Sequence, residues 1–150
     1  KAPTWDTHTN HFPQMKTLLP ALDTGVSAFI DDLDDRGLLD QTLVVCVGEF
    51  GRTPIISPLA GQKVPGRHHW SHGYTAVFVG GGVREGQVIG ETDRIGAYPV
   101  TVPFHPNDMG ATIYNALGID PHSMIPDRIN RPRHLNRGKV MDVLYTGVPT

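Results

Sequence analysis

Three short segments of this sequence concentrate carboxylate and imidazole side chains beside glycine, although they lie far apart along the chain. The first segment holds Asp6, His8 and His11, the second holds Glu49, and the third holds His68, His69 and His72. Carboxylate oxygens and imidazole nitrogens together suit a divalent metal ion. The pattern therefore predicts one metal site that draws residues from all three segments.

The first segment places two potential ligands on one side of the backbone. Asp6 and His8 stand two residues apart, so in an extended chain their side chains project in the same direction. The alternative interpretation is that both are incidental surface residues. His11 is assigned to the neighbourhood of a helix cap, and the spacing leaves open which histidine of the third segment is a ligand.

Glu49 follows an apolar run, residues 42–47, after a single glycine. Open α/β sheets gather their ligands at the carboxyl ends of strands, which is where this carboxylate is expected. Arg52 comes three residues later, and its planar guanidinium suits a phosphate or sulfate group. The alternative is a surface turn closed by an ion pair between Glu49 and Arg52.

The elements that position these residues read as an α/β pattern. Two unbroken apolar runs, residues 42–47 and 74–79, show no alternation and predict neighbouring strands of a mainly parallel sheet covered on both faces. A helix is predicted from Pro13 to a stop at Gly37, with a kink or a late start caused by Pro20. Its expected buried face consists of Met15, Leu18, Leu19, Leu22, Val26, Phe29, Ile30 and Leu33.

The second half of the chain predicts shorter elements. Residues 87–89 read as a short strand, and residues 108–117 as a helix capped by Asn107 and stopped by Gly118. The proline-rich last thirty residues are expected to wrap the surface, with a short helix around residues 139–145. Helix, buried strand, long loop, buried strand and helix together indicate an α/β domain.

Composition limits the protein classes that remain. A length of 150 residues with 39% apolar and 19% charged residues suits one compact domain. The net charge of −2 argues against a nucleic-acid partner or an anionic membrane surface. The sequence contains no apolar run of about 18 residues, so it predicts no membrane span. Cys46, the single cysteine, lies in an apolar run and is interpreted as a small buried hydrophobe.

Four sequence motifs in order carry a resemblance to a known family. They are Trp-Asp-Thr-His at 5–8, Gly-Glu-Phe-Gly-Arg-Thr-Pro at 48–54, Gly-Arg-His-His-Trp at 66–70, and Gly-Gly-Gly-Val-Arg-Glu-Gly-Gln-Val-Ile-Gly at 80–90. The chain resembles the sulfatase-like proteins catalogued as domain of unknown function 1501, from residue 5 to about residue 144. These proteins are in turn similar to the alkaline phosphatase and sulfatase superfamily.

The resemblance implies a three-layer α/β sandwich with a mainly parallel sheet and a metal site at the strand ends. It implies that residues 1–150 form the C-terminal part of one alkaline phosphatase-like domain. By the same resemblance, Asp6, His8, Glu49 and His69 are metal ligands, and Arg52 is the catalytic residue that steadies the ester oxygens. The implied cofactor is zinc, manganese or calcium. A periplasmic or exported location is implied as well.

The sequence departs from the superfamily pattern at several positions. Phe50 replaces a metal-binding histidine, His68 stands where the family usually has aspartate, and Asp6 and His8 are closer together than the usual pair. The segment that would supply the nucleophile is absent, and the chain begins at Lys1 without an initiator methionine or a signal peptide. These features indicate a fragment that is inactive by itself.

Three functions follow as alternatives from these observations. The first is the C-terminal part of a metal-dependent hydrolase whose substrate is a small anionic phosphate or sulfate ester. The second is a degenerate, non-catalytic binding or cell-surface module that keeps the fold, and the third is a structural domain with incidental histidines. Because a sheet without its first strands leaves an apolar face uncovered, self-association or cover by the proline-rich tail is expected.

Overall fold

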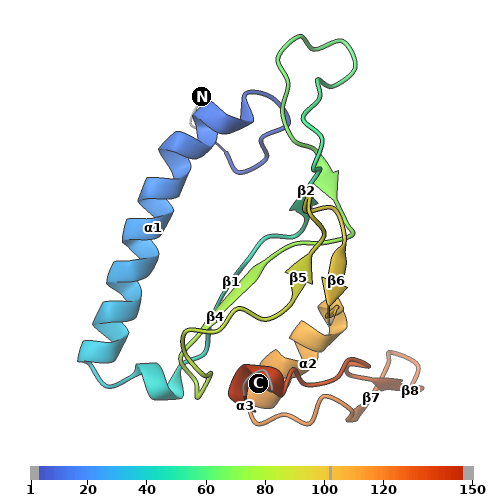
Figure 1. Cartoon of the computed structure of the whole chain (residues 1–150). Helices are drawn as coiled ribbons and strands as arrows, with labels where there is room; N and C mark the ends of the chain where they lie inside the picture. The colour runs from blue at the N-terminus through green and yellow to red at the C-terminus, as the bar shows by residue number, and fades with distance from the viewer. Residues whose placement is uncertain (1–3, 102, 147–150) are drawn as a thin grey trace.

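The computed structural model of the chain describes residues 4–101 and 103–146. Its longest element is α1, His11–Asp35, which forms the straight left-hand arm of Figure 1. The helix begins two residues before Pro13 and continues through Pro20 without interruption. It ends as predicted, because Gly37 adopts φ 65°, a left-handed conformation that glycine adopts without strain.

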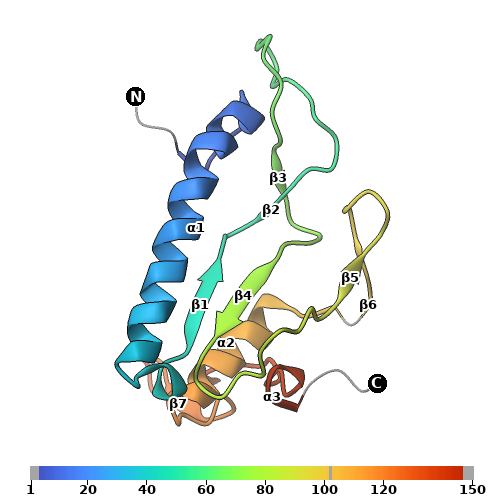
Figure 2. The same cartoon turned by 60° about the vertical axis from the view of Figure 1, so that its left-hand side comes forward.

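A long antiparallel ribbon follows α1 and the short 3-10 turn η1, Leu39–Gln41. Strand β1, Val44–Val47, pairs with β4, Ala76–Val79, and beyond them β2, Gly51–Arg52, pairs with β3, His69–Trp70. The ribbon closes at its tip through a bridge between Ser57 and Gly66. Figure 2 shows this ribbon running beside α1.

The predicted parallel sheet and three-layer sandwich are wrong for this structure. The two apolar runs do form neighbouring strands, but these are antiparallel and belong to a sheet of two strands. Parallel neighbours need a crossover, usually a helix, between them. The connection between β1 and β4 is rich in proline and glycine, and it folds back as a hairpin instead of forming a helix.

The remaining elements are shorter than α1 and follow the ribbon along the chain. Strands β5, Glu91–Thr92, and β6, Pro99–Thr101, form a second hairpin, whereas residues 87–89 form no strand. Helix α2, Pro106–Ala116, is capped by His105 rather than by Asn107, and Gly118 follows its end at φ 73°. The tail contributes β7, Met124–Pro126, paired with β8, Pro132–His134, and then α3, Val143–Thr146.

The tail folds back onto α2, whereas the sequence predicted only that it would wrap the surface or cover an exposed apolar face. The backbone N–H of Lys139 donates to the Asp108 carboxylate at 2.8 Å, and that of Met141 donates to the Thr112 hydroxyl at 2.9 Å. Asp108 also closes a capping box with His105 at the start of α2. Helix α2 and the tail therefore form one packed unit.

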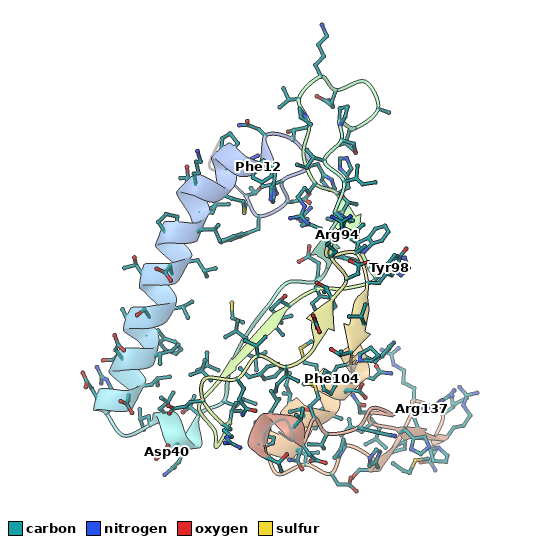
Figure 3. All side chains as sticks on the ribbon, in the orientation of Figure 1. Phe12, Asp40, Arg94, Tyr98, Phe104 and Arg137 are labelled. Atoms are coloured by element: carbon teal, nitrogen blue, oxygen red, sulfur yellow. The ribbon has the colours of Figure 1, made fainter. Side chains whose placement is uncertain are left out.

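The hydrophobic core is small. Among the described residues, the buried apolar side chains are Leu33, Ala97, Ala111, Met141 and Leu144. The apolar face of α1 is only partly covered, since Leu33 is buried whereas Leu22 remains 37% exposed and Phe29 51% exposed. Figure 3 shows the side chains of α1 and of the ribbon leaving open space between them. In the described part of the chain, no helix is long and apolar enough to cross a membrane.

Candidate metal centre

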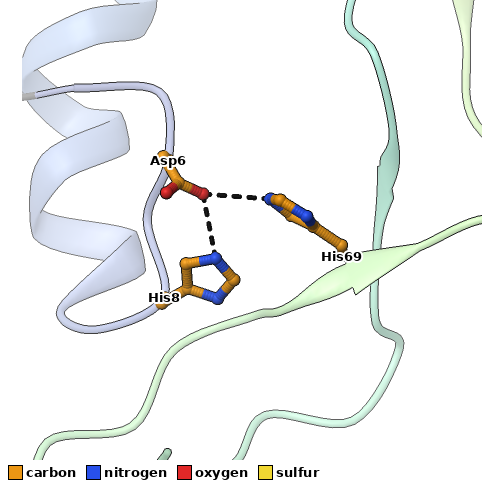
Figure 4. A group of neighbouring side chains, drawn as sticks. All are labelled: Asp6, His8 and His69. Atoms are coloured by element: carbon orange, nitrogen blue, oxygen red, sulfur yellow. Dashed lines mark hydrogen bonds and ion pairs between the residues drawn. The ribbon is translucent and has the colours of Figure 1, made fainter.

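Three of the four predicted metal ligands converge at one place. One ligand atom from each of Asp6, His8 and His69 lies within 4.8 Å of the other two. The Asp6 Oδ1 atom is 3.0 Å from His8 Nε2 and 3.0 Å from His69 Nε2 (Figure 4). We call these three residues the Asp-His-His cluster.

The β2–β3 pairing places two site residues next to each other. Arg52 on β2 is the cross-strand partner of His69 on β3. Directly paired residues of an antiparallel ladder hold their side chains close together. Phe50, just before β2, stacks on the His69 ring with centroids 5.2 Å apart and planes 5° apart. The position of His69 is therefore set by the hairpin register and by an aromatic neighbour.

The segment before α1 brings Asp6 and His8 to the hairpin. The Arg52 guanidinium donates to the Trp5 carbonyl at 2.8 Å, and the Asn10 N–H donates to the Pro65 carbonyl at 3.0 Å. Thr7, between the two ligands, is 1% exposed, and its hydroxyl lies 2.6 Å from Nδ1 of the buried His11. His11 thus anchors the segment at the start of α1, in keeping with its prediction as a cap neighbour.

The Asp6 carboxylate is held in its charged form by its neighbours. Hydrogen bonding to His69 is the largest influence that lowers the pKa of Asp6. Desolvation is the next largest and acts in the opposite direction, and His8 and Arg52 lower the pKa further. Both terminal nitrogens of Arg52 lie 3.4 Å from Asp6 Oδ1. Arg52 is therefore part of the site, where it contacts a ligand and the Trp5 backbone.

His68 is a site residue that the sequence did not assign. Its Nδ1 lies 3.0 Å from Nδ1 of His8, and its Nε2 lies 3.1 Å from the Ser57 carbonyl oxygen. His72, the other histidine of this segment, packs against Trp70 and Tyr98 instead. Spacing could not separate these residues, because only the contact with His8 distinguishes His68.

The structure does not bring Glu49 into the cluster. Glu49 lies in the exposed turn between β1 and β2, and its carboxylate is not among the atoms that converge with Asp6. The alternative interpretation, an ion pair between Glu49 and Arg52, is not found among the described residues either, where Arg52 pairs with Asp6. His105, His122 and His134 are likewise outside the cluster.

The donor set fits a divalent metal ion. Three atoms bound tetrahedrally at about 2.0–2.1 Å from one ion are roughly 3.3 Å apart, close to the 3.0 Å contacts around Asp6 Oδ1. Three protein ligands leave a coordination position open, as in catalytic zinc sites. The cluster is accessible, because the side chains of Asp6 and His69 are 59% and 42% exposed.

An apolar hollow of about 260 Å³ lies near the hairpin tip and is lined by Thr53, Pro54, Ile55, Ser57 and Trp70. None of the three cluster residues lines it. The hollow is therefore separate from the Asp-His-His cluster.

Comparison with known proteins places the chain in a family. No curated protein and no solved structure matches the chain. Residues 1–144 match the family described as "Protein of unknown function (DUF1501)". Because the match covers nearly the whole length, the chain belongs to the DUF1501 family.

Proposed function

We propose that this chain supplies a divalent-metal site to a hydrolase of phosphate or sulfate esters. The observation that supports the proposal is the convergence of the Asp-His-His cluster, with Arg52 beside it. The sulfatase-like part of the proposal rests on the motif resemblance, and the substrate would be a small anionic ester.

The residues of the chain would divide the work as follows. Asp6, His8 and His69 would hold the ion, which would act as a Lewis acid on an ester oxygen. Arg52 would add positive charge near an anionic substrate and, after the larger effect of the hydrogen bond from His69, would help to keep Asp6 ionised. In the described residues no serine, threonine or cysteine side chain hydrogen-bonds to the cluster, so the nucleophile would come from another part of the full-length protein.

The donor atoms narrow the choice of metal. Calcium is bound by six to eight oxygen ligands, whereas two of the three donors here are imidazole nitrogens. Imidazole with carboxylate suits zinc, and manganese accepts the carboxylate and water oxygens. Zinc or manganese is therefore proposed ahead of calcium.

A non-catalytic, metal-holding module is the second candidate. Phe50 occupies the position of a ligand in the resembling superfamily, and here it stacks on His69. Glu49 does not join the cluster, which leaves three protein ligands. A site reduced in this way would still bind a metal without turning over an ester.

Metal titration of the purified chain tests the proposal. We expect zinc or manganese to bind at one site in isothermal titration calorimetry. Loss of an outer-shell partner typically weakens metal binding about 10–100-fold, so removal of a ligand in Asp6→Ala or His69→Ala should cost more than this. His134→Ala, at an exposed histidine on β8, is the matched control and should bind as the wild type does.

Two further measurements separate the alternatives. Glu49→Ala should leave affinity unchanged if the site has three protein ligands, and a large loss would restore Glu49 as a ligand. Hydrolysis of an aryl phosphate or aryl sulfate by the full-length protein, abolished by Asp6→Ala, would support the hydrolase. Metal binding without turnover would favour the non-catalytic module, and no metal binding at all would contradict both.

A further inference from the structure

We propose that His68 is a positioning residue that fixes the tautomer of His8 and thereby presents the His8 Nε2 lone pair to the metal. The inference rests on the proposed metal site and assigns a role to a residue outside the three ligands. It follows from the hydrogen-bond partners of the two imidazole rings.

Both ring nitrogens of His8 are engaged. Nε2 faces Asp6 Oδ1 at 3.0 Å, and Nδ1 faces Nδ1 of His68 at 3.0 Å. The ring planes are nearly parallel, at 18°, and the ring centroids lie 5.3 Å apart. His68 in turn reaches the Ser57 carbonyl through its Nε2 at 3.1 Å. A continuous path therefore runs from a backbone carbonyl through two imidazoles to the carboxylate of the cluster.

The carbonyl at the start of this path decides where the hydrogens lie. A carbonyl oxygen only accepts, so His68 Nε2 must carry hydrogen and donate to Ser57. In a neutral imidazole the other nitrogen is then an acceptor, so His68 Nδ1 accepts from His8 Nδ1–H. His8 Nε2 is left with a lone pair, which is the form that binds a metal.

That lone pair points at a second acceptor. Asp6 Oδ1 is a carboxylate oxygen, and an ionised carboxylate too offers only lone pairs to His8 Nε2. Two acceptors 3.0 Å apart repel unless a cation lies between them. A metal held jointly by Asp6 and His8 satisfies both atoms and leaves every hydrogen bond of the path correctly paired.

The backbone holds His68 rigidly enough for this role. Its N–H donates to the Thr53 hydroxyl at 3.0 Å, and its carbonyl accepts from the Thr53 N–H at 2.8 Å. Ser57 is fixed by the bridge with Gly66, in which the two residues exchange hydrogen bonds of 3.0 and 3.1 Å. Outer-shell partners of this kind orient a ligating histidine and increase its basicity.

Substitutions at His68 separate positioning from packing. In His68→Asn, the amide oxygen stands near the place of Nδ1 and can accept from His8 Nδ1–H. His68→Leu keeps bulk but offers no acceptor. We expect His68→Leu to weaken zinc binding about 10–100-fold, and His68→Asn to restore most of the affinity. His72→Leu is the matched control, because His72 contacts Trp70 and Tyr98 rather than His8.

Nitrogen-15 NMR of the zinc-loaded wild-type chain reads the tautomer directly and needs no substitution. We expect a protonated Nδ1 and a metal-shifted Nε2 on His8, with the Nδ1 hydrogen protected from exchange. Loss of this protection in His68→Leu, at an unchanged melting temperature, would support the positioning role. If His68→Leu does not fold, the wild-type spectrum still decides the assignment.

The measurements distinguish a failure of the proposed His68 role from a failure of the proposed metal site. If the wild-type chain binds zinc but His68→Leu binds equally well, or if zinc is found on His8 Nδ1, the role of His68 is overturned and the metal site stands. If the wild-type chain binds neither zinc nor manganese, both proposals are overturned.

Discussion

At the scale of single residues, the lowered pKa values of Asp6 and Asp108 have different causes. At Asp6 the main influence is the hydrogen bond with the His69 side chain, which belongs to the proposed metal site. At Asp108 the main influence is the backbone N–H of Lys139, followed by that of His105. The lowered pKa of Asp6 thus favours the charged carboxylate that metal binding would need, whereas Asp108 joins the tail to the start of α2.

The stability supplied by Asp108 should depend on pH. Because the folded-state pKa is lowered from its ordinary value of about 3.9, the contribution is fully present above that value and is lost as pH falls through the folded-state value. We expect Asp108→Asn to lower the free energy of unfolding by roughly 1 kcal/mol at pH 7, as loss of a cap does.

Urea denaturation of wild type and Asp108→Asn at several pH values measures this difference. The gap should narrow below about pH 4 as the wild-type carboxylate is protonated. Asp23→Asn, on the exposed side of α1, is the control and should leave stability nearly unchanged at every pH. A gap that stays constant down to pH 2 would contradict the electrostatic account.

At the scale of elements, the metal site depends on close contact between a loop and a hairpin. A Cβ atom added at Gly66 would overlap the His8 carbonyl group and approach the Thr9 nitrogen. Only a residue without a side chain lets the hairpin tip approach this peptide. Gly66 therefore determines the distance between His8 on one segment and His69 on the other.

Gly66→Ala should disturb the site by forcing these segments apart. Overpacking of this kind costs roughly 1–3 kcal/mol, and we expect a lower melting temperature together with weaker zinc binding. Gly25→Ala in α1 is the matched control, since nothing lies within 4 Å of its added Cβ and alanine is favoured in a helix. Wild-type zinc affinity in Gly66→Ala would show that this contact does not set the ligand geometry.

At the scale of the whole molecule, the chain exposes far more surface than its mass requires. Its accessible surface is 10824 Å², whereas a folded monomer of 16.4 kDa is expected to expose roughly 7,500 Å². The excess is larger than the roughly 800 Å² that each partner buries in a standard interface. Much of it is apolar and includes the uncovered face of α1.

We expect this surface to be covered by a second copy when the chain is isolated. Light scattering after size exclusion should give a dimer or larger species at micromolar concentration. Leu22→Glu and Phe29→Glu, which place charges on the exposed face of α1, should shift the chain toward monomer. Lys16→Glu, at another exposed position of α1, is the control. A monomer that binds no hydrophobic dye would contradict the expectation.

The sequence by itself determined the local features of this protein. Helical spacing located α1, apolar runs located β1 and β4, and glycines marked the ends of α1 and α2, because these signals depend on neighbouring residues. Residue type and spacing also indicated Asp6 and His8 as metal ligands, and the motif resemblance added His69. This remains a prediction, although the structure brings the three residues together.

Tertiary structure decided three things: whether the strands run parallel or antiparallel, how much of the apolar face of α1 is covered, and which residues belong to the site. The apolar runs located the strands but decided neither their direction nor their cover. We wrongly expected β1 and β4 to be parallel and covered on both faces, whereas they are antiparallel and none of their residues is buried. Likewise, His68 and His72 share a residue type and a loop, but only His68 contacts His8. Such contacts join residues about sixty positions apart, and no local pattern records which of them will meet.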